Sequence, residues 1–128
     1  MRTGFVFVTL FLLFQLPSSN VYAADYTNSL LFKVTIWQDG VETEFEFENP
    51  SHYEWENGST VIKGEKAKEK VKELYNRLEI SNKVEKEHLL VSLQHEFPNL
   101  DGFVVRWIDP NNNLYTWHWN RKENQKSE

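Results

Sequence analysis

Two runs of alternating apolar and polar residues flank an Asp39-Gly40 pair early in the chain. Residues 30–38 (LLFKVTIWQ) and 41–48 (VETEFEFE) have the period-two pattern of half-buried strands. Asp-Gly is a strong signal for a two-residue hairpin turn, because that turn needs positive φ. The predicted pairs are Phe32–Phe47, Val34–Phe45 and Ile36–Thr43 on one face, and Lys33–Glu46, Thr35–Glu44 and Trp37–Glu42 on the other. Of the six residue pairs, the three on one face hold all the apolar residues except Trp37, so the register is internally consistent.

A second, shorter hairpin is predicted around Asn57-Gly58. Residues 52–56 (HYEWE) and 59–63 (STVIK) form its arms. The predicted pairs are Tyr53–Ile62 and Trp55–Thr60. An ordered loop over residues 50–63 is the alternative, because five-residue arms around a polar turn do not require a hairpin.

From Gly64 onward the apolar spacing becomes helical. The stripe of the first predicted helix is Ala67, Val71, Leu74, Tyr75 and Leu78. Residues 82–85 (NKVE) resemble a capping box that opens a second helix, which we expect to stop at Phe97, before Pro98. Leu89, Leu93 and Phe97 form its main stripe, with Leu90 beside it.

The last predicted element is a hairpin of residues 103–108 (FVVRWI) and 114–120 (LYTWHWN), joined by a five-residue loop. The loop pairs Ile108 with Leu114. One face then holds Phe103, Val105, Trp107, Tyr115, Trp117 and Trp119, and the other holds Val104, Arg106, Ile108, Leu114, Thr116 and His118. This separation predicts that the final strand belongs to the core. A ligand platform is the alternative, and it requires Trp119 to be exposed.

Together these elements predict an α+β fold in the order β-β-(β-β)-α-α-β-β. Two to three hairpins form an antiparallel sheet, and two helices pack on one face of it. The fold occupies residues 30–120 as a single domain, between a polar lead-in at 24–29 and a charged tail at 121–128.

The N-terminus has the layout of a secretory signal. Arg2 precedes an apolar run at 5–16. Val21 and Ala23 then place short or small residues at the −3 and −1 positions of a signal-peptidase site. We therefore expect a signal peptide at 1–23, cleaved after Ala23, and a secreted or cell-surface protein; an uncleaved signal would instead hold the chain at the membrane. The chain has no cysteine, which excludes a lipid anchor at this site, and export without disulfides favours a bacterial protein.

Charge limits the possible partners. Beyond residue 23 the chain has thirteen basic and nineteen acidic residues, a formal net charge of −6. This balance disfavours nucleic acid, whose phosphates need a basic surface. It favours a basic partner, either a protein or a component associated with the cell wall.

The clearest candidate surface is the polar face of the first hairpin. Glu42, Glu44, Glu46 and Glu48 alternate along one strand and therefore line one face. The predicted partner surface comprises Trp37, Glu42, Glu44 and Glu46. The alternatives are a merely solvated acidic face that protects the sheet from aggregation, a Ca²⁺ site, and an acid–base pair.

Catalytic and metal motifs are weak. Asp109, Asn111 and Asn113 match the start of an EF-hand loop, but Leu114 replaces its glycine and Asn120 its bidentate glutamate. His88 and His95 are about 10.5 Å apart along a helix, too far for a single zinc ion. We therefore predict no metal, no cofactor and no enzymatic activity, with a small hydrolase as a remote alternative.

The order of elements resembles the YusW-like family of small exported Bacillus proteins. The resemblance rests on FKVTIWQDGVETEFEFE, on NGSTVIKGEKAKEKVKELYNRL, and on the leucine-bearing second helix and final hairpin, over residues 30–120. It implies fold and location but no activity. The sequence thus predicts a secreted, non-enzymatic binding protein of unknown partner. A carbohydrate- or peptide-binding module that uses exposed Trp37, Trp55 or Trp119 is the main alternative.

Overall fold

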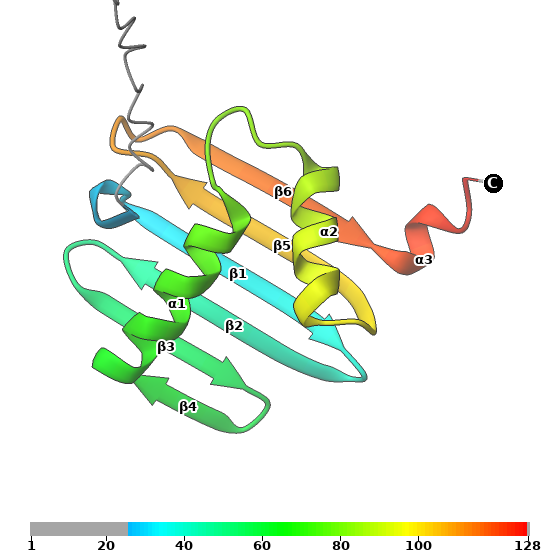
Figure 1. Ribbon diagram of the computed structural model, residues 1–128, viewed down its shortest axis with the longest axis horizontal. Coiled ribbons are helices and arrows are strands. Elements are labelled where there is room, and N and C mark those ends of the chain that lie inside the picture. Colours follow the sequence, from blue (N-terminus) through cyan, green and yellow to red (C-terminus); the bar gives the residue numbers. More distant parts are fainter. Residues whose placement is uncertain (1–25, 128) are drawn as a thin grey trace, which may run out of the picture.

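The computed structural model describes residues 26–127, which form an antiparallel sheet covered by helices on one face (Figure 1). The elements are a 3-10 turn (Tyr26–Asn28), β1 (Leu31–Gln38), β2 (Val41–Glu48), β3 (His52–Asn57), β4 (Thr60–Lys63), α1 (Glu65–Leu78), α2 (Lys86–Glu96), β5 (Leu100–Ile108), β6 (Leu114–Asn120) and α3 (Arg121–Asn124). The predicted α+β class and element order are confirmed. The predicted signal at 1–23 lies outside the described residues.

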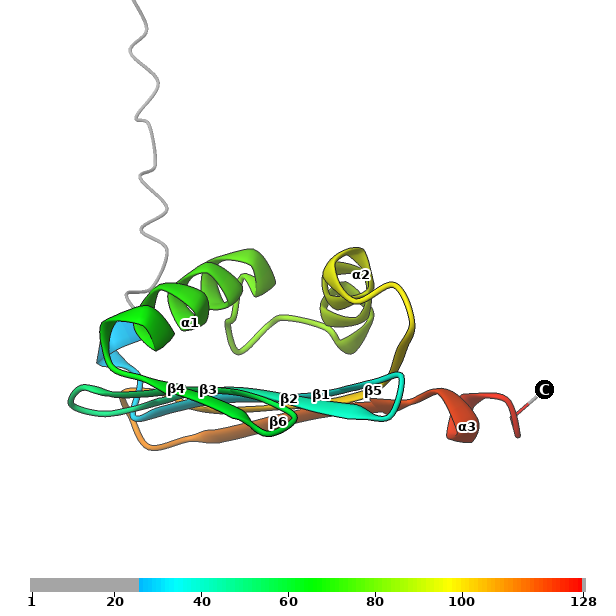
Figure 2. The ribbon, with the colours of Figure 1, turned by 90° about the horizontal axis from the view of Figure 1, so that it is seen from below.

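The six strands are arranged in the order β4-β3-β2-β1-β5-β6. The β1–β2 register is the predicted one, with Ile36 opposite Thr43, and both turn residues have positive φ (Asp39 52°, Gly40 76°). β5 returns across the sheet to pair with the other side of β1, so that Lys33 lies opposite Arg106. Figure 2 shows α1 and α2 on one side of the sheet and α3 beyond its end, with no helix of residues 26–127 covering the other side. One sheet face is therefore uncovered.

The second hairpin exists, but its predicted register is wrong by two residues. Trp55 lies opposite Ile62, not Thr60. The reason is that Asn57 belongs to β3, where it pairs with Thr43 and donates from Nδ2 to Thr43 Oγ1 at 2.8 Å. The turn therefore falls on residues 58–59, and Gly58 supplies the positive φ (56°) that a primed hairpin turn needs.

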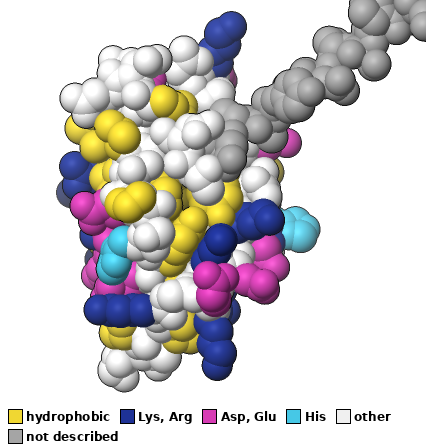
Figure 3. Space-filling model, turned by 90° about the vertical axis from the view of Figure 1, so that its left-hand side faces the viewer, with side chains coloured by type: hydrophobic (Ala, Val, Ile, Leu, Met, Phe, Trp, Pro, Cys, Tyr) yellow, Lys and Arg dark blue, Asp and Glu magenta, His cyan; other side chains and the backbone are white. Residues whose placement is uncertain are grey.

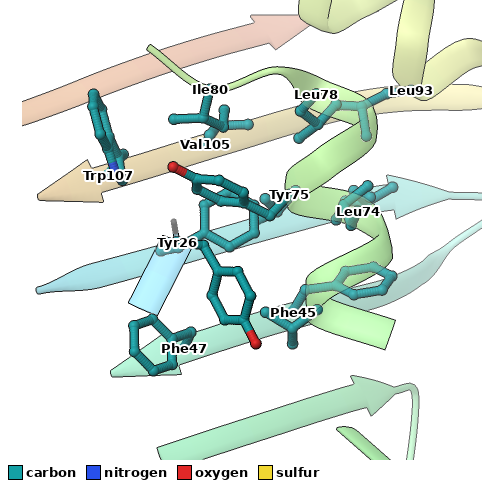
Figure 4. Packing of buried hydrophobic residues seen from close by; sticks show 14 of the residues in the cluster. Tyr26, Phe45, Phe47, Leu74, Tyr75, Leu78, Ile80, Leu93, Val105 and Trp107 are labelled. Atoms are coloured by element: carbon teal, nitrogen blue, oxygen red, sulfur yellow. The ribbon is translucent and has the colours of Figure 1, made fainter. Parts of the chain in front are cut away.

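The core lies between the sheet and the two longer helices. All five stripe residues predicted for α1 are buried. Figure 4 shows Leu74 and Tyr75 of α1 among Phe45 of β2 and Val105 of β5. Tyr26 of the lead-in is also buried, edge-on to Phe47 with ring centroids 5.6 Å apart. A lead-in predicted only as polar thus contributes an aromatic to the core.

The second helix begins later than predicted. α2 starts at Lys86 after Glu85, and no side chain caps it, so the proposed capping box at 82–85 is wrong. Its backbone enters the helix only after Val84, whose carbonyl accepts a hydrogen bond from Trp117 Nε1 at 3.1 Å. This contact ties the segment before α2 to β6. The α2 stripe is confirmed at Leu89 and Leu93, which are fully buried.

The final hairpin has the predicted five-residue loop and register, with Ile108 opposite Leu114. β6 continues into the short α3, which the sequence did not predict. Asn120 caps α3 by accepting from the backbone N–H of Lys122 at 2.9 Å. None of the helices within residues 26–127 is long and apolar enough to cross a membrane.

Candidate binding surface

The uncovered sheet face, called here the open face, is built by strand alternation. Every second residue of β1, β2 and β3 points away from the helices, and β2 and β3 place glutamates at most of these positions. The acidic half of the open face is Glu42, Glu44, Glu46, Glu48, Glu54 and Glu56. In Figure 3 acidic, basic and histidine side chains gather along the left margin, which is this face seen side-on. The predicted residues Trp37, Glu42, Glu44 and Glu46 therefore share one surface.

Lys33 lies in the middle of the acidic half. Its Nζ is 2.9 Å from Glu44 Oε1 and 3.1 Å from Glu46 Oε2. Partial burial lowers the pKa of Lys33, but the hydrogen bonds and attraction from the two glutamates outweigh burial and raise the pKa overall. Lys33 therefore stays charged and offsets part of the surrounding negative charge.

Two carboxylates on β3 influence each other's titration. Glu54 and Glu56 point to the same side of the strand, and a hydrogen bond between their side chains lowers the pKa of Glu54 and raises the pKa of Glu56. The negative charge of Glu44 on the adjacent strand raises the pKa of Glu56 further. Nearby like charges therefore disfavour the ionised form of Glu56.

The basic side chains at the rim of the acidic half, His52 and Lys63, make only long contacts with the glutamates. His52 Nε2 is 3.7 Å from Glu46 and 3.6 Å from Glu54, and Lys63 Nζ is 3.5 Å from Glu54. Their side chains are well exposed, and surface pairs of this kind contribute about 0–1 kcal/mol. They leave the acidic half with an excess of negative charge.

Trp37 borders a separate hollow at one end of the open face. Its indole Nε1 donates to Glu42 Oε2 at 3.2 Å, and the residue is 38% exposed. A Cβ on Gly102 would lie 3.6 Å from Trp37 Cε3, so the ring lies across this glycine. The hollow has a volume of about 480 Å³, and Asp101, Asn120, Arg121, Lys122 and Gln125 complete its lining.

The other two tryptophans considered from the sequence lie on the helix-covered side of the sheet. Trp119 is half-buried and stacks on Phe103 with ring centroids 6.4 Å apart. Trp55 is half-buried beneath Lys70, whose Nζ is 4.5 Å from the ring centroid. Trp119 therefore belongs to the margin of the core. Of these three tryptophans, only Trp37 faces the open side.

The histidines and the Asp109 loop are the metal-site candidates of the sequence. Within residues 26–127 no group of three histidine, aspartate or glutamate side chains is placed to hold a metal ion. Asp109 Oδ1 accepts from the backbone N–H of Asn111 and of Asn113, both at 2.9 Å, and Oδ2 accepts from Asn113 Nδ2. Donation by the Asn113 side chain is the main cause that lowers the pKa of Asp109. The carboxylate therefore organises its own turn.

A cavity of about 160 Å³ lies where α1 and α2 meet the sheet. Its lining includes Glu73, Glu96 and Arg77 but no histidine or serine. Arg77 forms an ion pair with Glu96 across the two helices. This cavity brings together an interhelical ion pair and two carboxylates, those of Glu73 and Glu96.

Comparison with protein-family models, with characterised proteins and with solved structures produced no match. The resemblance to the YusW-like family therefore stays a prediction.

Sequence reasoning missed several members of the surface. The surface predicted from the sequence lacks Glu54 and Glu56, although the alternation of residues 52–57 places them with the β2 glutamates once β3 pairs with β2. Arg106 could not be placed there from the sequence, because its position beside Lys33 depends on the pairing of β5 with β1.

Proposed function

We propose that this chain is an exported, non-enzymatic binding protein that docks a basic partner on the acidic half of its open face. The observation that carries the proposal is the arrangement of Glu42, Glu44, Glu46, Glu48, Glu54 and Glu56 in adjacent rows on one sheet face, where Lys33 pairs with only two of them. A lysine- or arginine-rich partner would supply the missing positive charge. The signal-like N-terminus supports the exported location.

The shape of the surface agrees with this kind of partner. The open face is a sheet surface without covering helices, as Figure 2 shows, and it presents the acidic side chains in parallel rows. Electrostatic complementarity on such a surface increases the association rate and favours partners of opposite charge. The same attraction is screened by salt, with a Debye length of about 8 Å at physiological ionic strength.

The test measures the affinity of a short oligolysine peptide by calorimetry at low and high salt. Glu44→Gln/Glu56→Gln removes two charges from the acidic half and is expected to weaken binding about five- to tenfold. Glu65→Gln/Glu69→Gln removes two exposed charges from α1 and is the matched control. Equal affinities for the two double variants, or binding that strengthens with salt, would overturn the proposal.

The Trp37 hollow favours a second candidate function, the binding of an acidic sugar. An exposed indole provides a platform for the apolar face of a sugar ring, while Lys122 and Asn120 lie within the same lining. Titration with oligogalacturonate should then change the tryptophan fluorescence of the protein. Trp37→Ala should abolish this change and Trp55→Phe should retain it. No change with the unaltered protein would exclude this candidate.

A further inference from the structure

β6 is an unprotected edge strand. It is the last strand of the sheet on the side of β5, and its seven residues carry no lysine, arginine, acid or proline. Edge strands are usually protected from pairing with other chains by charges, prolines, bulges or very short length. Figure 1 shows α3 beyond the end of β6 and α2 above the sheet, so neither helix lies alongside the outer edge.

Hydrogen-bond alternation determines which backbone groups of β6 are free. The backbone N–H of Asp109 donates to the Asn113 carbonyl at 3.0 Å, so the Ile108–Leu114 pair that follows is not hydrogen-bonded. By alternation, Tyr115, Trp117 and Trp119 exchange hydrogen bonds with β5. The backbone groups of Leu114, Thr116, His118 and Asn120 then point outward from the sheet.

We propose that this edge pairs with the same edge of a second copy of the chain to form a symmetric dimer. Two antiparallel β6 strands centred on Trp117 place Thr116 opposite His118 of the second copy, and His118 opposite Thr116. These two inner pairs alone add about four backbone hydrogen bonds. Because β6 has no charged residue, no like charges face each other in this register.

The side chains of β6 match this arrangement. Tyr115, Trp117 and Trp119 are all half-exposed along one side of the edge, although tryptophan and tyrosine contribute most when fully covered. In the symmetric pair, Trp117 lies opposite Trp117 of the second copy. This is a non-hydrogen-bonded pair, in which the side chains of antiparallel strands approach most closely. Tyr115 lies opposite Trp119 of the second copy. The aromatic row thus becomes continuous across the interface.

The pairing is closed rather than open-ended. The opposite edge of the sheet is β4, which has four residues and ends at Lys63 and Gly64. When two β6 strands pair with each other, neither copy has another exposed β6 edge for a third copy. Such self-complementary pairing is the property of an isologous dimer. This favours a defined dimer over a fibre.

Salt dependence separates this inference from the proposed function. Each copy has a net charge of −6 beyond residue 23, so two copies repel each other at long range. Screening by salt should therefore strengthen the dimer, whereas it should weaken binding of oligolysine. The open face can bind a basic partner in a monomer, and the β6 edge can dimerise without any partner.

Amide hydrogen exchange provides the direct readout. The test protein is residues 24–128, which contain every described residue of the fold, with the full chain measured in parallel. In the dimer the N–H groups of Thr116 and His118 should be protected, and protection should increase with protein concentration. The N–H of Trp117 bonds to β5 in either state and is the internal control. Unprotected Thr116 and His118 amides at all concentrations up to about 1 mM would overturn the proposal.

Two variants test the same interface by sedimentation. Thr116→Pro removes an outward N–H that no intramolecular bond uses, and prolines at such edge positions are compatible with a strand. His118→Lys adds a charge to the edge without requiring any change of backbone. Each should raise the dimer dissociation constant at least about tenfold, while His52→Lys on β3 should not. Retention of the dimer by the folded His118→Lys variant would contradict the proposal.

Discussion

Replacing Lys33 with methionine tests the electrostatics of the acidic half. Lys33 forms ion pairs with Glu44 and Glu46, and its side chain is 30% exposed. Each such pair contributes up to about 1 kcal/mol, and methionine retains most of the apolar stem. We therefore expect Lys33→Met to lower the free energy of unfolding by about 1 kcal/mol. For a domain of this size, that corresponds to a fall in Tm of about 4–8 °C.

The same substitution has a second, more specific consequence. The positive charge of Lys33 lowers the pKa of Glu56, so its removal should raise that pKa further. Thermal unfolding followed by circular dichroism measures the first effect, and carboxyl NMR titration of Glu56 measures the second. The pKa of Lys33 is itself raised in the folded protein. The stability that Lys33 contributes to the fold is therefore present below the ordinary lysine pKa, and it is lost as the pH rises through the raised pKa.

Lys72→Met provides the matched control, because Lys72 is exposed on α1 and forms no ion pair within residues 26–127. It should change stability by less than about 0.5 kcal/mol and leave the Glu56 titration unaltered. If Lys33→Met behaved like this control in both measurements, the carboxylates of β2 and β3 would not interact as described, and the reasoning would be refuted.

Three further predictions concern other parts of the fold. Trp107→Phe removes the 2.8 Å bond from Nε1 to the buried Ser29 hydroxyl and should cost about 1–3 kcal/mol in urea unfolding, whereas no loss would contradict the role of that bond. Gly58→Ala introduces a side chain at φ 56° and should cost about 1 kcal/mol by thermal unfolding, although nothing lies closer than 3.8 Å to the added Cβ. The pKa of Asp109 is lowered in the folded protein. The stabilisation that its carboxylate contributes is therefore present above the pKa of the unfolded state, and it is lost as the pH falls through the pKa of the folded state. The stability difference between the protein and Asp109→Asn should therefore shrink on acidification, and a constant difference would rule this out.

Local pattern was sufficient where turn chemistry and alternation agreed. Asp39-Gly40 and the alternating arms around it determine one register, since a shift by one residue would move Phe45 and Phe47 to the open face. The α1 stripe was equally predictable from the 3.6-residue period. These features placed Trp37 and the β2 glutamates on a common surface without knowledge of the sheet order.

The remaining features depend on tertiary contacts. The pairing of Asn57 with Thr43 moves the second turn by one position, and the sequence does not reveal this contact. Pairing of β5 with β1 brings Arg106 beside Lys33 from more than seventy positions away. Tyr26 is buried against Phe47, Tyr53 and Tyr75, which come from other parts of the chain. Long-range pairing therefore determined the position of Arg106 and the parts of the core that pattern could not predict.

The most direct test of the central claim maps where a basic ligand binds. Oligolysine is titrated into the isotopically labelled protein at low salt, and amide chemical shifts are followed for every residue. We expect the changes to concentrate on β2 and β3, at Glu44, Glu46, Glu54 and Glu56, and to disappear at high salt. Changes centred on the exposed glutamates of α1, or spread evenly over the surface, would contradict it.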